Sequence, residues 1–115
     1  MVYYMVCFLL SQITFDSVKT LSSSGYKVLF VDVRSEGFFK NYPIFKGAIN
    51  IPFDLLLEGY MPPKGYDLYV TVCWCPRGGI GKRAVEILRE RGFNAVWLKR
   101  DGKEFEDQED KVSGK

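Results

Sequence analysis

One stretch of the sequence holds a nucleophilic side chain beside groups that attract anions. Cys75 is followed by a positive residue, Arg77, and by glycines at positions 78, 79 and 81. Glycines let backbone N–H groups converge on one point, and the start of a helix attracts negative charge. A cysteine beside such a concavity ionises more readily and is a better nucleophile. We predict that Cys75 is the catalytic nucleophile and that the substrate-binding loop comprises Pro76, Arg77, Gly78, Gly79, Ile80 and Gly81.

Further charged residues lie close to this loop, either in the sequence or at the end of another predicted strand. Lys82 and Arg83 follow the loop and would make its rim positive, but they suit a solvated helix start equally well. Asp32 and Arg34 stand at the end of an apolar run. We expect Asp32 and Arg34 to brace the loop by hydrogen bonds and not to take part in the chemistry.

Cys73 allows two interpretations. It lies two residues before Cys75 on a predicted strand, so both side chains would point to the same face. A cysteine in this position is most often a small buried apolar residue. Alternatively, Cys73 is a resolving thiol for oxidised Cys75, through a disulfide that would be strained and therefore labile.

The sequence contains no histidine and three cysteines. This excludes a Ser-His-Asp triad, a Cys-His pair and a zinc site with histidine ligands. A thiolate must therefore be stabilised by backbone dipoles or by arginine and lysine. The third cysteine, Cys7, lies far from the other two in the sequence, and an odd, low count argues against a disulfide framework. We expect neither a metal site nor a cofactor.

Strand and helix patterns alternate around the predicted site. The apolar run 68–73 predicts a strand, and the periodic residues from Ala84 to Arg91 predict a helix that ends at Gly92. Residues 28–33 predict a buried parallel strand, whose carboxyl end carries charges. The remaining patterns predict helices over 13–21, with Thr14 as N-cap, and over 53–57, a helical turn over 38–42, and strands near 48–51 and over 95–98. The alternation predicts an α/β fold, with a small, mostly parallel sheet that carries helices on both faces.

Length and composition are those of one globular domain. The chain has 115 residues and a formal net charge of only +2, so we expect no nucleic-acid partner. The apolar run 2–10 is too short to span a bilayer, and we predict that it forms an edge or core strand. It also lacks the flanks of a signal peptide. We therefore expect no membrane association and a cytoplasmic location, with a charged, frayed tail over 106–115.

Three sequence blocks resemble the single-domain rhodanese-like sulfurtransferases. They are Asp32-Val33-Arg34, Gly47-Ala48-Ile49-Asn50-Ile51-Pro52, and the layout of cysteine, short loop, helix and Gly-Phe from Cys75 to Phe93. The resemblance runs from Ile13 to about Phe105, and it assigns residues 1–105 to one rhodanese-like domain. It also places Cys75, and not Cys73, on the catalytic position.

The resemblance implies a sulfur-transfer reaction. Cys75 would take a sulfane sulfur from thiosulfate, a persulfide or a polysulfide, hold it as a persulfide, and pass it to a thiol or a cyanide-like acceptor. A protein is a further candidate acceptor. Two features depart from the family. The usual histidine is missing from segment 42–46, and Ile80 stands where many members carry an arginine that helps to bind the anionic donor. Arg77 is a candidate to supply that charge.

Three other functions compete with this interpretation. Phosphatases and arsenate reductases of related fold need an arginine six residues after the cysteine, but Gly81 follows Cys75 at that distance and Gly79 follows Cys73. A non-catalytic rhodanese-like binding or regulatory module is favoured by the missing arginine and disfavoured by the retained Cys75. A dithiol redox protein would use Cys73 and Cys75. The last two remain alternatives.

Overall fold

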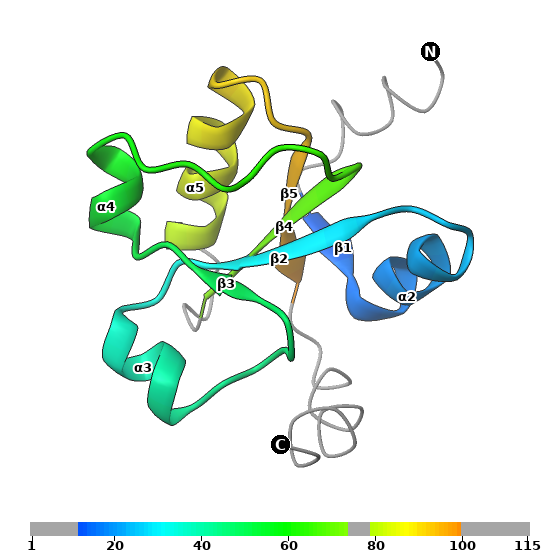
Figure 1. The fold of residues 1–115 in the computed structure, drawn as a ribbon, viewed down its shortest axis with the longest axis horizontal. Coiled ribbons are helices and arrows are strands. Elements are labelled where there is room, and N and C mark those ends of the chain that lie inside the picture. Colours follow the sequence, from blue (N-terminus) through cyan, green and yellow to red (C-terminus); the bar gives the residue numbers. More distant parts are fainter. Residues whose placement is uncertain (1–11, 74–78, 100–115) are drawn as a thin grey trace.

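The structure is a computed structural model, and it describes residues 12–73 and 79–99. These residues form a five-stranded sheet in the order β1-β5-β4-β2-β3 (Figure 1). Every pair of neighbouring strands is parallel. The strands are β1 (Gln12–Thr14), β2 (Val28–Asp32), β3 (Ile49–Asn50), β4 (Leu68–Val72) and β5 (Ala95–Lys99). The predicted parallel sheet is confirmed, with β4 at its centre.

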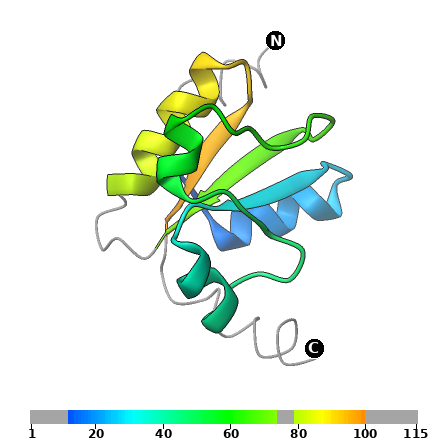
Figure 2. The ribbon, with the colours of Figure 1, turned by 60° about the vertical axis from the view of Figure 1, so that its left-hand side comes forward.

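Helices cover both faces of this sheet, as predicted. They are α2 (Phe15–Ser23), α3 (Glu36–Asn41), α4 (Phe53–Leu57) and α5 (Gly79–Glu90). Figures 1 and 2 show α4 and α5 on one side of the sheet and α2 on the other. Two apolar clusters match these layers: one contains buried residues of α4 and α5, and the other contains those of α2. The α3 helix has no buried residue and lies at the edge of the fold.

The central strand β4 shows why a continuous apolar run folds in this way. All of its residues are buried. Leu68, Val70 and Val72 pack in the cluster under α2, whereas Tyr69 and, just after the strand, Cys73 pack in the cluster under α5. A strand whose side chains alternate between two covered faces is therefore apolar at nearly every position. The exception is Thr71, whose buried hydroxyl donates a hydrogen bond to the Gly81 carbonyl.

The helix boundaries differ from the predictions in three places. The α3 helix spans Glu36–Asn41, whereas a helical turn over 38–42 was predicted. Thr14 is the N-cap of α2, and its hydroxyl accepts a hydrogen bond from the Ser17 amide at 3.2 Å, but residues 12–14 are a strand and the helix begins at Phe15. The α5 helix begins at Gly79, well before the predicted Ala84. The prediction treated the glycines as loop residues, and Gly79 and Gly81 in fact have helical angles.

Two predicted segments lie outside the described residues. They are the strand over 2–10 and the tail over 106–115. Within 12–73 and 79–99, no helix has the length and apolar character that a membrane crossing requires.

Candidate functional site

The site lies at the carboxyl edge of the sheet, where β2 and β4 end side by side. Asp32 is in register with Val72, and the Val33 amide donates a hydrogen bond to the Val72 carbonyl at 3.0 Å. Cys73 follows β4 directly, and α5 begins at Gly79. The predicted nucleophile Cys75 and the loop residues Pro76, Arg77 and Gly78 lie between these points, outside the described residues.

Asp32 and Arg34 form a buried ion pair at this edge. Asp32 is 1% exposed and Arg34 is 7% exposed. The Arg34 guanidinium donates to both carboxylate oxygens, with Nε to Oδ1 at 2.9 Å and Nη2 to Oδ2 at 2.7 Å. Nη2 also donates to the Tyr42 carbonyl at 2.8 Å. Because both charges are out of water, each needs the other, and the pair ties the end of β2 to the end of α3.

Asn50 completes this brace. Its side-chain amide donates to the Asp32 carbonyl at 2.9 Å and to the Arg34 carbonyl at 3.0 Å. Among the described residues, Asp32 and Arg34 therefore hold β2, β3 and α3 together. The expected bracing of the cysteine loop concerns residues outside the described ranges. The role of Asn50 was not predicted, although an asparagine in an otherwise apolar strand is a signal for such bonds.

The first turn of α5 packs tightly against the sheet. A Cβ atom on Gly81 would lie 2.4 Å from Trp97 Cδ1 and 3.3 Å from Cys73 Sγ. Gly81 is therefore required by close packing, since its backbone is not in the left-handed conformation that favours glycine. The Thr71 hydroxyl donates to the Gly81 carbonyl at 2.9 Å. Together these contacts fix the start of α5 beside Cys73.

The two cations after this turn have ordinary surface environments. Lys82 places its Nζ 4.9 Å from the centre of the Trp97 ring, a cation–π contact. Arg83 is exposed and lies 3.9 Å from Glu86, a pair that contributes little in water. Arg83 therefore matches the alternative of a solvated helix start.

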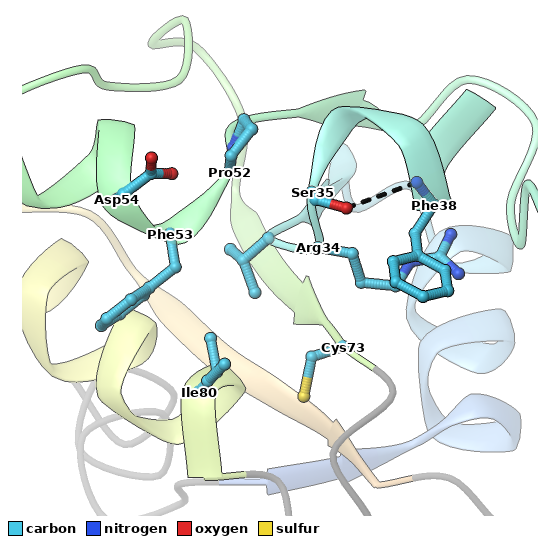
Figure 3. A pocket seen from close by; sticks show the side chains of 9 residues that line it. Arg34, Ser35, Phe38, Pro52, Phe53, Asp54, Cys73 and Ile80 are labelled. Atoms are coloured by element: carbon cyan, nitrogen blue, oxygen red, sulfur yellow. Dashed lines mark hydrogen bonds between the residues drawn. The ribbon is translucent and has the colours of Figure 1, made fainter.

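A pocket of about 460 Å³ opens beside Cys73 (Figure 3). It is lined by Val33, Arg34, Ser35, Phe38, Pro52, Phe53, Asp54, Cys73 and Ile80. These residues come from the carboxyl ends of β2 and β4 and from the first turns of α3, α4 and α5. Of the predicted site residues that the structure describes, Arg34, Cys73 and Ile80 line it, whereas Asp32, Gly79, Gly81, Lys82 and Arg83 do not.

Six lining residues were not among the predicted site residues: Val33, Ser35, Phe38, Pro52, Phe53 and Asp54. The two aromatic ones are Phe38 and Phe53. Both were assigned to short apolar helix segments, without a functional role. The available signal was position, because each follows closely on the carboxyl end of a strand, Phe38 after β2 and Phe53 after β3. Ligands bind outside these ends in open α/β sheets.

Solved structures of known proteins share this architecture. A rhodanese-related protein from Thermoplasma volcanium superposes with a TM-score of 0.65 at 22% identity, covering 84% of this chain and 91% of that one. The single-domain sulfurtransferase RDL2 from Saccharomyces cerevisiae gives 0.57 at 23%, with coverages of 86% and 90%. The human single-domain sulfurtransferase TSTD1 gives 0.57 at 22%, with coverages of 84% and 96%. No family model and no curated protein matches the sequence. The chain shares the fold of these structures.

Proposed function

We propose, for a chain that has the rhodanese-like fold, that it is a sulfurtransferase with Cys75 as the sulfur carrier. One observation carries the proposal. The segment that contains Cys75 runs directly from the end of the central strand, β4, to the start of α5, at the carboxyl edge of a parallel sheet. The residues on either side of this segment are described: Cys73 lines the pocket, and Gly79 begins the helix.

The position of α5 supports the activation of a thiolate. The first amides of any helix have no acceptor within the helix, and the dipole of a helix of this length, 12 residues, favours negative charge at its start. In many enzymes a histidine base deprotonates the catalytic thiol. Because this sequence has no histidine, the helix amides and nearby cations must stabilise the thiolate instead. The packing of Gly81 against Trp97 and Cys73 keeps the helix start in place.

In the proposed reaction, the Cys75 thiolate attacks the outer sulfur of thiosulfate, a persulfide or a polysulfide. A new S–S bond forms at Cys75, and the donor's own bond to that sulfur breaks with its electron pair leaving on the donor. The resulting persulfide then gives its outer sulfur to a thiol, to a cyanide-like molecule or to a protein acceptor. This second step restores the Cys75 thiolate.

The environment of Cys73 favours the sulfurtransferase over a dithiol redox protein. Cys73 is 2% exposed and packs in the apolar cluster beneath α5. A resolving thiol must reach its partner and then a reductant, whereas a buried cysteine packed among apolar side chains is typically inert. The activity is therefore proposed to depend on Cys75 alone.

Intact-mass measurement after incubation with thiosulfate, and separately with polysulfide, tests the proposal. The reduced protein is compared with Cys75→Ser and with Cys73→Ser and Cys7→Ser as matched controls. We expect a gain of one sulfur atom in the parent and both controls, reversed by cyanide, and none in Cys75→Ser. No gain with either donor would leave a non-catalytic binding module as the better account. Loss of turnover in a folded Cys73→Ser variant would favour the dithiol redox protein instead.

A further inference from the structure

We propose that the pocket beside Cys73 binds the organic part of the sulfur donor, and that the preferred donor carries an apolar group of aromatic size on its sulfane sulfur unit. Organic persulfides and thiosulfonates share this chemistry. The inference rests on the proposed function and specifies its substrate class.

The size of the pocket exceeds what thiosulfate needs. Its volume of about 460 Å³ lies within the range of sites that enclose small organic molecules. Thiosulfate is a compact inorganic ion and would leave most of this space unfilled. A donor with an aryl or branched alkyl group would occupy the space while its sulfur lies at the Cys73 end of the pocket.

The walls have the chemistry of an apolar binding site. Figure 3 shows Phe53 and Phe38 at two sides of the pocket, with Ile80 and Cys73 between them. Phe38 is 49% exposed and Ile80 is 42% exposed, so much apolar surface here faces water. A ligand that covers apolar surface gains roughly 25 cal/mol for each Å² removed from water, and a thiosulfate ion offers no apolar surface to match.

The charges of the described lining residues do not favour a dianion. The charged residues among them are Arg34 and Asp54. The Arg34 guanidinium binds the Asp32 carboxylate through Nε and Nη2, so this pair carries no net charge. The remaining charge, on Asp54, is negative and repels an anion. The described part of the pocket therefore suits an organic group better than an inorganic dianion.

The chemical step is the same for this class of donor. With a thiosulfonate, the Cys75 thiolate attacks the outer sulfur, the bond between that sulfur and the sulfonyl sulfur breaks, and the electron pair leaves with the sulfinate. The cysteine sulfur is oxidised to a persulfide and the thiosulfonate is reduced to a sulfinate. One anion enters and one leaves, so no further oxidant, reductant or proton is required.

Steady-state kinetics with cyanide as acceptor test the donor class. The donors are benzenethiosulfonate, methanethiosulfonate and thiosulfate. Each kcat/KM is divided by the rate constant of the uncatalysed reaction of the same donor with cyanide, which gives a corrected kcat/KM. We expect benzenethiosulfonate to exceed methanethiosulfonate by about tenfold or more, the discrimination that several buried carbon atoms give in an apolar pocket. Equal corrected values for the two thiosulfonates would overturn the inference.

Variants locate the preference in this pocket. Phe38→Ala removes a wall of the pocket and should reduce the preference for benzenethiosulfonate over methanethiosulfonate several-fold. Ile80→Arg should lower the benzenethiosulfonate value and raise the thiosulfate value. Tyr60→Ala is the matched control, since Tyr60 is 59% exposed and lies outside the described lining. A preference that survives both pocket variants, or that falls equally in the control, would contradict the assignment.

Separate readouts distinguish the two proposals. If mass measurement shows the persulfide on Cys75 with every donor but no corrected preference, sulfur transfer stands and the donor class fails. If no donor loads Cys75, the proposed function fails. In that case calorimetric binding of benzenethiosulfonate to Cys75→Ser still tests the pocket, and binding no tighter than that of thiosulfate would overturn its assignment too.

Discussion

At the scale of single residues, the Asp32–Arg34 pair shows how a charged motif can serve structure at the edge of a site. The two side chains meet through two short hydrogen bonds and are almost entirely out of water. The sequence motif predicted a supporting role for these residues. The partners Tyr42 and Asn50 were not predictable, because they depend on which segments the fold brings to the end of β2.

Removing one member of this pair should destabilise the protein strongly. Asp32→Ala leaves the Arg34 guanidinium buried without its carboxylate, and we expect the free energy of unfolding to fall by about 3–5 kcal/mol. Denaturation by urea measures the change. The double variant Asp32→Leu/Arg34→Met should recover part of the loss, because it removes both charges together. Equal stability of Asp32→Ala and the parent would show that the pair is not a buried ion pair in solution.

At the scale of elements, the packing of α5 on the sheet decides where the candidate site lies. Gly81 touches Trp97 of β5 and Cys73 after β4, while Thr71 of β4 holds its carbonyl. The strand β4 was predictable because its run is apolar at every position except Thr71 and is rich in β-branched and aromatic residues. The first residue of α5 was not predictable. A sequence does not distinguish a glycine that close packing requires from a glycine that a turn requires.

Substitutions of Gly79 and Gly81, which lie in the same helical turn, test whether close packing requires a glycine at position 81. Gly81→Ala would place a methyl group 2.4 Å from Trp97, so we expect a loss of about 1–3 kcal/mol in the free energy of unfolding. Gly79→Ala meets nothing within 4 Å and has helical angles, so it should stabilise the protein by up to about 1 kcal/mol. Thermal unfolding of the two variants provides the comparison. Equal effects would mean that α5 does not pack as described.

At the scale of the whole molecule, the two ends of the parallel strands differ in function. The carboxyl edge carries the pocket, whereas the turn after α2, at Gly25 and Tyr26, precedes β2 at the opposite edge. The parallel topology was predictable from the alternation of strands and helices. The pocket was not, because Phe38 and Phe53 belong to different helices and come to line one pocket only when the sheet has assembled.

Insertions at the two edges should therefore have different effects. A Gly-Ser pair inserted between Tyr26 and Lys27 lengthens a surface connection, and we expect a stability loss of no more than about 1 kcal/mol with the donor preference unchanged. The same pair between Ile51 and Pro52 displaces Phe53 and should reduce the preference for benzenethiosulfonate. Turnover with the two thiosulfonates and urea denaturation are measured on both variants. Loss of preference in the first variant alone would contradict the separation of the edges.

The described lining of the pocket comes from three strand ends, those of β2, β3 and β4, and from the first turns of the helices that follow them, and none of these contains the pocket alone. No fragment that lacks one of these segments can present the full binding surface. Donor discrimination is thus a reporter of complete folding. Across a denaturant titration it should vanish together with the last fraction of native sheet, while a persulfide on an unfolded cysteine would form without regard to the donor's organic group.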